Sequence, residues 1–192
     1  AHDAAGRAVQ DHFARTGLQA TYEPAPRVPY HQRIHYALPR PLPHVTIIIP
    51  TKDRADLLAR CVRSVMPSTY RPFDVVIVDN ASSEPASMSC FEQLQREPDV
   101  SVMRIDEPFN FSRLNNLAAA RARGTLLCFL NNDTEVISPD WLEEMVSHAV
   151  REDVGAVGAM LYYPDDTIQH AGVGLGLGGI ASHPHRGLRR GS

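Results

Sequence analysis

The sequence lacks several features that would place it in a functional class at once. No apolar run is long enough to span a bilayer, and no secretory signal is visible. The formal net charge of -3 gives no excess of positive charge, which argues against a nucleic-acid partner. Hydrophobic residues make up 43% and charged residues 21% of the 192 residues. This is the composition of an ordinary globular domain that can bury a substantial core.

Cysteine is scarce. The three cysteines, Cys61, Cys90 and Cys128, are an odd number without the spacing of metal ligands. Cys61 and Cys128 fall inside apolar patterns, where a thiol behaves as a small core residue. Reduced thiols are typical of the cytoplasm, so we expect a cytoplasmic protein.

Two phosphate-binding signatures are also absent. No Gly-x-Gly-x-x-Gly follows the first expected strand, and no Gly-x-x-x-x-Gly-Lys-Ser/Thr occurs. A glycine-rich run over residues 172–179 comes late and opens no helix, so we expect a loop there. A simple dinucleotide-binding or P-loop protein is therefore not supported.

Residues 1–43 are expected to lead into the main domain. A short helix is expected over residues 3–16, followed by Gly17 as its stop. Six prolines between residues 24 and 43 forbid a long helix, so a connector with an edge strand over residues 32–37 is expected.

From residue 44 to residue 192, short apolar runs alternate with helical patterns. Strands are expected over residues 45–49, 75–78, 100–105, 126–130 and 156–161, with helices between them. The run over 126–130 is expected to be buried on both faces. Gly124 is expected to stop the helix before it. This order predicts an α/β fold of three layers, a mainly parallel sheet with helices on both faces.

Polar residues follow four of these strands. They are Thr51, Lys52 and Asp53, then Asp79 and Asn80, then Asp106, and finally Asn131, Asn132 and Asp133. Because the carboxyl ends of parallel strands share one edge of a sheet, this edge is expected to bind a ligand. Several carboxylates would repel a diphosphate unless a divalent cation intervenes. The alternative is that these residues form turns and helix caps, as Asp53 can for the helix after it.

Three segments occur in order at residues 45–51, 76–82 and 129–133, with asparagines at 110, 115 and 116 before the last of them. Together these motifs resemble those of the family 2 glycosyltransferases with the GT-A fold, of the bacterial polysaccharide or O-antigen type. The resemblance covers about residues 44–187. It implies sugar transfer from a nucleotide diphosphate donor, with inversion and with Mg²⁺ or Mn²⁺, to a surface polysaccharide or a lipid-linked glycan. It further implies action at the cytoplasmic face of the inner membrane, with peripheral membrane association through the parent protein.

Carried over by position, the resemblance implies a set of donor-site residues. They are Pro50, Thr51, Arg54, Asp79, Asn80, Asn110, Asn115, Asn131 and Asn132. Asp79 would hold the base or the ribose. Asn131 stands where the family's Asp-x-Asp motif has its first Asp, so Asp133 is the expected metal ligand.

The family's catalytic base is a carboxylate in a later motif, and no convincing match follows Asp133. The pair Asp165-Asp166 is typical of a turn. The chain opens at Ala1 without Met and stops at Ser192. We therefore expect a fragment of a longer protein, truncated at the acceptor side, whose base lies beyond Ser192.

Three other interpretations of the site residues are open beside a glycosyltransferase. A nucleotidyltransferase would need a glycine-rich basic loop after the first strand, and residues 51–54 hold no glycine. A non-catalytic nucleotide-sugar or carbohydrate-binding module within a larger protein would need no base. Finally, His170, His183 and His185 could contact a metal or a diphosphate, although exposed or structural histidines are more common.

Overall fold

The structure is a computed structural model that describes residues 2–25, 31–176 and 180–189. Contacts between Cα atoms divide the chain into two compact units, Pro39–Glu143 and Ala1–Leu38 with Glu144–Ser192. This division differs from the one expected at residue 43, because the segment after Glu143 groups with the amino-terminal segment. Each unit is described by itself.

The Pro39–Glu143 unit is built on a parallel sheet with the strand order β5-β4-β3-β6. Its strands are β3 (Val45–Thr51), β4 (Phe73–Asp79), β5 (Val100–Arg104) and β6 (Leu126–Phe129). The central strand β3 pairs with β4 from Val45↔Phe73 to Thr51↔Asp79, and with β6 on its other side. The β-branched runs favour these strands, and burial of both faces of β3 makes it the core of the sheet.

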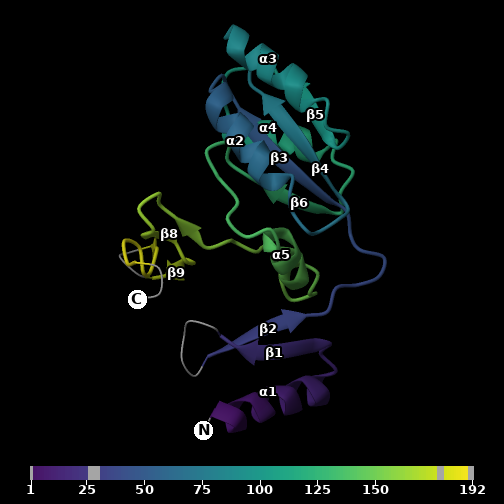
Figure 1. The fold of residues 1–192 in the computed structure, drawn as a ribbon, viewed down its shortest axis with the longest axis vertical. Coiled ribbons are helices and arrows are strands. Elements are labelled where there is room, and N and C mark those ends of the chain that lie inside the picture. The colour runs from purple at the N-terminus through teal and green to yellow at the C-terminus, as the bar shows by residue number, and fades with distance from the viewer. Residues whose placement is uncertain (1, 26–30, 177–179, 190–192) are drawn as a thin grey trace. The chain divides into compact units, whose positions relative to one another are not determined.

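Helices cover both faces of this sheet, as Figure 1 shows for α2 (Ala55–Val65), α3 (Pro85–Leu94) and α4 (Phe111–Ala119). On one face, α2 buries an apolar stripe of Leu58, Cys61, Val62 and Val65. On the other face, α4 packs through Leu114 and Ala118 against the sheet in a cluster with Ile48, Val78 and Ile105. The predicted three-layer, mainly parallel α/β fold is confirmed.

The expectation that the fourth strand is buried on both faces is wrong. In β6 the side chains alternate between half-buried and exposed, and Leu127 and Phe129 are 41% and 52% exposed. The reason is that β6 is the edge strand of this sheet, so a strand lies beside it on one side only and fewer neighbours cover its side chains.

Two local predictions are also corrected. Asp53 does not cap α2, whose N-cap is Arg54 without a side-chain hydrogen bond. Gly124 does not stop α4, which ends at Ala119. Gly124 lies instead where a Cβ atom would come within 2.5 Å of the backbone nitrogen of Thr46, so the close approach to β3 requires glycine.

The second unit holds α1 (His2–Thr16) and the antiparallel hairpin of β1 (Ala20–Pro24) and β2 (Gln32–Tyr36). The helix over 3–16 and the strand over 32–37 were predicted, whereas β1 was not. The helix α5 (Trp141–Ala149) begins in the first unit and ends in the second. Among the described helices, none combines the length and the apolar character needed to cross a membrane.

The prediction of a fifth strand over residues 156–161 is wrong. Only β7 (Leu161–Tyr162) forms, and it pairs with β8 (Ile168–His170) rather than joining the parallel sheet. Gly158 within the run weakens a strand because it has no side chain to pack. Farther along, β9 (Gly174–Leu175) pairs with β10 (Ala181–Ser182). The rest of the expected glycine-rich loop, residues 177–179, lies outside the described residues.

Candidate functional site

A cleft of about 420 Å³ lies at the carboxyl ends of β3, β4 and β6. The chain runs from β3 to β4 on one side and later returns to place β6 on the other side of β3. Such a reversal of strand order is where open α/β sheets bind ligands. The lining residues are Pro50, Thr51, Lys52, Arg54, Leu57, Asn80, Phe109, Phe111, Leu114, Asn131, Asn132 and Asp133.

Most of the residues expected at the donor site line this one cleft. They are Pro50, Thr51, Arg54, Asn80, Asn131 and Asn132, together with the expected metal ligand Asp133. Three others, Asp79, Asn110 and Asn115, do not line it.

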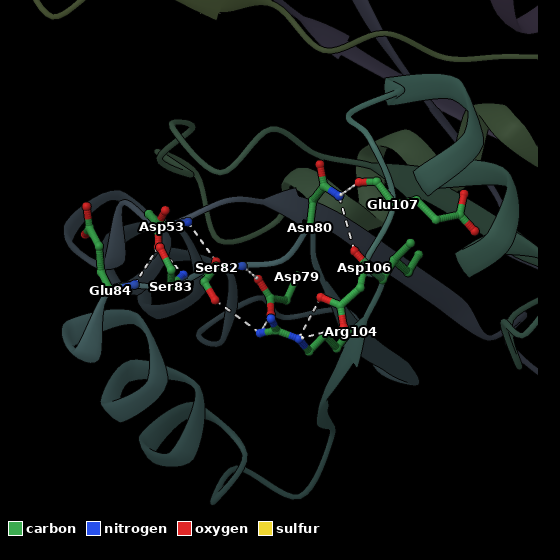
Figure 2. A network of polar contacts seen from close by, with 10 residues as sticks. Asp53, Asp79, Asn80, Ser82, Ser83, Glu84, Arg104, Asp106 and Glu107 are labelled. Carbon is green, nitrogen blue, oxygen red and sulfur yellow. Dashed lines mark hydrogen bonds and ion pairs between the residues drawn. The ribbon is translucent and has the colours of Figure 1, made fainter.

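Asp79 is buried, and both of its carboxylate oxygens have partners within the protein (Figure 2). The Ser82 amide donates to Oδ1 at 2.8 Å, and Arg104 Nη1 donates to Oδ2 at 3.0 Å. Arg104 also donates through Nε to Asp106 at 3.0 Å, and the bond to Asp106, together with Asp79, raises the pKa of the guanidinium. These bonds hold the β4–α3 loop, and the expected contact of Asp79 with the base or the ribose stays a prediction.

Asn80, the next residue, is buried at the cleft wall. Its Nδ2 donates to the carbonyl oxygens of Ile105 and Glu107, at 3.2 and 2.8 Å, which fixes the orientation of the amide. Its Oδ1 is buried without a hydrogen-bond partner. A buried acceptor without a donor is costly, so Asn80 is the cleft residue that gains most from an N–H or O–H group of a ligand.

Asn110 and Asn115 organise α4. The Oδ1 of Asn110 accepts from the Arg113 amide at 2.9 Å and caps the helix. Asn115 donates to the Phe111 carbonyl oxygen at 2.8 Å, and its Oδ1 is a second buried acceptor without a partner. Both residues make hydrogen bonds in the first turns of α4, and Phe111 in that part of the helix lines the cleft.

The turn after β6 carries Asn131, Asn132 and Asp133 into the cleft. It is fixed to β3 by a hydrogen bond from Asn132 Nδ2 to Thr51 Oγ1, at 2.9 Å. Cys61 of α2 lies beneath this turn, with its Sγ 3.6 Å from the Asn131 carbonyl oxygen. Burial, and then the nearby charge of Asp133, raises the pKa of Cys61 to about 12, so this thiol is a packing group.

Sequence reasoning placed Lys52 at the edge of the sheet but did not name it as a site residue, and it missed Phe109 and Phe111. Lys52 and Arg54 are the two cationic side chains of the cleft lining. Phe109 is 70% exposed, although it is large and apolar. The available signal was two aromatic residues close to Asn110, in a loop otherwise expected to be polar.

The histidines expected as alternative ligands are not cleft residues. His170 Nδ1 lies 3.0 Å from His183 Nδ1, with the rings edge to face, and His185 is in a turn with a φ of 64°. The predicted turn at Asp165 is confirmed, since Asp165 accepts from the Thr167 amide at 3.1 Å.

The donor set of the cleft suits a hard divalent cation only when ligand oxygens complete it. Within the described ranges, no group of three or more His, Cys, Asp or Glu side chains is placed to hold a metal ion. The cleft offers the carboxylate of Asp133 and the side-chain amides of Asn131 and Asn132. Mg²⁺ is usually held by one or two carboxylates together with phosphate oxygens and water, and these residues fit that pattern.

Comparison with known proteins agrees with this architecture. The model of the family described as Glycosyl transferase family 2 matches residues 46–175, which include β3 from its second residue, β4 to β6 and every residue of the cleft.

Two relatives in bacteria are similar along nearly the whole chain. The O-antigen biosynthesis protein RfbC of Myxococcus xanthus is 45% identical over 93% of this chain. An uncharacterized protein, y4gI of Sinorhizobium fredii, is 44% identical over 96% of it. The chain spans 14% and 20% of the length of these relatives.

Among solved structures, a mannosyltransferase of Pyrobaculum calidifontis, in complex with GDP-Man and Mn²⁺, has a TM-score of 0.58 with this chain. It is 22% identical, and the match covers 86% of this chain and 45% of that protein. At this identity the likeness concerns the fold, and it confirms the predicted glycosyltransferase type of sheet.

Proposed function

The chain belongs to glycosyl transferase family 2, and we propose that it is the donor-binding part of a glycosyltransferase that synthesises a polysaccharide. Its donor is a sugar attached to a nucleotide diphosphate. The observation that carries this proposal is the composition of the cleft. Two cations and one carboxylate, Lys52, Arg54 and Asp133, line it together with amide groups at the carboxyl edge of the sheet. This set suits a diphosphate joined to a polar nucleoside and a sugar.

The proposal assigns a role in donor binding to several residues that line the cleft. Lys52 and Arg54 attract the diphosphate, Asn80 hydrogen-bonds the nucleoside, and Phe109 offers a ring face for the base. Asp133, with Asn131 and Asn132, would hold a Mg²⁺ or Mn²⁺ ion. When bound, such a cation supplies charge neutralisation for the leaving diphosphate.

The proposed reaction inverts the configuration at the transferred sugar, and the acceptor is a surface polysaccharide or a lipid-linked glycan. In such a transfer a base takes the proton of the acceptor hydroxyl. Among the described residues that line the cleft, Asp133 is the one carboxylate. We therefore propose that the base comes from a part of the protein that does not line this cleft.

We also propose a cytoplasmic location, with peripheral attachment of the parent protein to the membrane. The name of the relative from Myxococcus xanthus, an O-antigen biosynthesis protein, supports a membrane-bound pathway. The three cysteines are free, which suits a reducing compartment.

Calorimetry with UDP, dTDP and GDP tests the proposal, with and without Mn²⁺. At least one diphosphate is expected to bind, and Mn²⁺ is expected to strengthen binding. Asp133→Asn should weaken binding in Mn²⁺ at least about tenfold and should not weaken binding without metal, where the Asp133 carboxylate repels the diphosphate. Glu135→Gln is the matched control, since Glu135 is an exposed carboxylate outside the cleft lining. Absence of metal-dependent binding of all three diphosphates would refute the proposal.

A second candidate function is a non-catalytic nucleotide-sugar or carbohydrate-binding module. The single carboxylate in the described cleft lining favours it. Donor hydrolysis by the full-length parent protein separates the two, measured for the wild type and for Asp133→Ala. Equal hydrolysis by both proteins would exclude Asp133 from a catalytic mechanism and favour the binding module.

A further inference from the structure

Two loops that form the cleft are joined by three short hydrogen bonds, shown in Figure 2. The Asp53 amide donates to Ser82 Oγ at 2.7 Å. In the opposite direction, the amides of Ser83 and Glu84 donate to Asp53 Oδ1, at 2.9 and 3.0 Å. We call these three bonds the Asp53–Ser82 clasp. It connects the β3–α2 loop with the β4–α3 loop.

Both loops carry cleft residues next to the clasp. Lys52 and Arg54 flank Asp53 in the first loop, and Asn80 lies in the second. The backbone is strained on both sides, because Asp53, Arg54 and Ala81 have φ angles of 52°, 54° and 56°. Residues other than glycine keep such left-handed conformations only where the surroundings impose them.

The second loop is also fixed from the side of β5. Asp79 accepts from the Ser82 amide, and Arg104 donates to both the Asp79 carboxylate and the Ser82 carbonyl oxygen. Ser82 is therefore held by its amide, its carbonyl group and its hydroxyl group. Through the clasp, the β3–α2 loop is bonded to a loop that is itself fixed at the ends of β4 and β5.

The clasp also occupies the two amides that precede the first residue of α3. The free amides at a helix amino terminus are a common place for a phosphate. Here the amides of Ser83 and Glu84 are occupied by the Asp53 carboxylate, whose pKa they lower. Glu84 is the N-cap of α3. These two amides are therefore taken, and the cationic side chains that a diphosphate in the cleft can meet are Lys52 and Arg54, beside the metal ion proposed at Asp133.

We propose that Asp53 is a positioning residue for donor binding. It holds the β3–α2 loop, which carries Lys52 and Arg54, against the β4–α3 loop. Asp53 itself does not line the cleft. This inference rests on the proposed function, since it assigns the clasp to the binding of a nucleotide diphosphate.

The test compares Asp53→Ala with Asp53→Asn in the 192-residue chain. Alanine removes the acceptor of two amides, whereas asparagine keeps a carbonyl oxygen at the same place. Asp165→Ala is the matched control, because Asp165 also accepts from a backbone amide in a turn but is not a cleft residue. Hydrogen exchange of the Ser83 and Glu84 amides measures the clasp, and calorimetry with UDP, dTDP and GDP in Mn²⁺ measures donor-site affinity.

The expected result is faster exchange of both amides and a loss of roughly tenfold in diphosphate affinity for Asp53→Ala. Asp53→Asn should restore protection and most of the affinity, and Asp165→Ala should leave both unchanged. Faster exchange in Asp53→Ala with unchanged affinity would overturn the positioning role while the proposed function stands. If the wild type bound none of the three diphosphates, the proposed function and the positioning role would both fall, whatever the exchange data show for the clasp.

Discussion

Replacing Thr46 by valine should destabilise the Pro39–Glu143 unit and leave the cleft intact. Thr46 is fully buried at the start of β3. Its hydroxyl donates to Asp74 Oδ1 at 2.8 Å and accepts from the Gly124 amide at 2.9 Å. Valine keeps nearly the same shape but makes neither hydrogen bond, so the change isolates the polar contribution.

The magnitude follows from the two bonds that are lost. A hydrogen bond to a charged group contributes about 1.5–3 kcal/mol, and an amide left without a partner costs about 1–3 kcal/mol. The upper ends of these two free-energy ranges do not apply to Thr46→Val. Asp74 keeps His44 Nε2 at 2.7 Å and Arg123 Nη2 at 3.4 Å, and Gly124 is partly exposed. We therefore expect a loss of about 2–4 kcal/mol in the free energy of unfolding.

The assay is urea unfolding followed by the fluorescence of Trp141, the one tryptophan of the sequence. Its indole Nε1 donates to Ser68 Oγ at 2.7 Å within the same unit. Thr46→Ser keeps the hydroxyl and loses one buried methyl group, so it should cost only about 1 kcal/mol. If Thr46→Val were as stable as Thr46→Ser, the buried hydrogen bonds would not contribute as argued. The affinity for nucleotide should not change, because Thr46 lies at the amino end of β3.

Three further predictions concern the cleft and the titrating groups. Phe109→Ala should weaken nucleotide diphosphate binding by roughly 5- to 150-fold in calorimetry, the range for one stacked base. Phe109→Ala should not change the free energy of unfolding. Ile137→Ala, an exposed control outside the cleft lining, should change neither nucleotide binding nor stability. Burial raises the pKa of Cys128 to about 12, so DTNB at pH 8 should label it about 1,000-fold more slowly than an ordinary thiol until urea is added. Hydrogen bonds from Glu84 and Ser83 lower the pKa of Asp53 below 3.8, so these two bonds are strongest with the ionised carboxylate and weaken as pH falls through the lowered value. Protection of the two amides should therefore decline in the wild type below about pH 4, toward the level of Asp53→Asn, whose neutral amide gives a protection that does not depend on Asp53 titration.

The strands and helices of the sheet could be predicted because their apolar patterns are long and agree with their flanking residues. Residues 45–49 and 75–78 are β-branched runs, and both are strands in the structure. The stretch over 156–161 is apolar too, but pairing with a neighbour decides whether such a run becomes a strand, and no local pattern records the neighbour. The exposure of Phe129 has the same origin, because the position of β6 at the edge is set by topology.

The cleft could be predicted only in outline. The sequence shows which residues follow the strands, and most of these residues do meet at one edge. It does not show which of two adjacent residues points into the cleft. Asp79 pairs with Thr51 as the last residue of β4, and Asn80 follows it. Successive side chains leave a strand on opposite sides, so Asp79 turns toward Arg104 and Asn80 toward the segment before α4.

This division of roles resolves the electrostatic conflict that the sequence raised. Four strand ends carry acidic residues, which would together repel a diphosphate. In the structure, Asp53 accepts from the amides before α3, and Asp79 and Asp106 share the guanidinium of Arg104. Of the four acidic residues, only Asp133 lines the cleft, where Lys52 and Arg54 also lie. The acidic strand ends thus serve mainly to fix the loops, and a single cation beside Asp133 would be enough to admit the diphosphate.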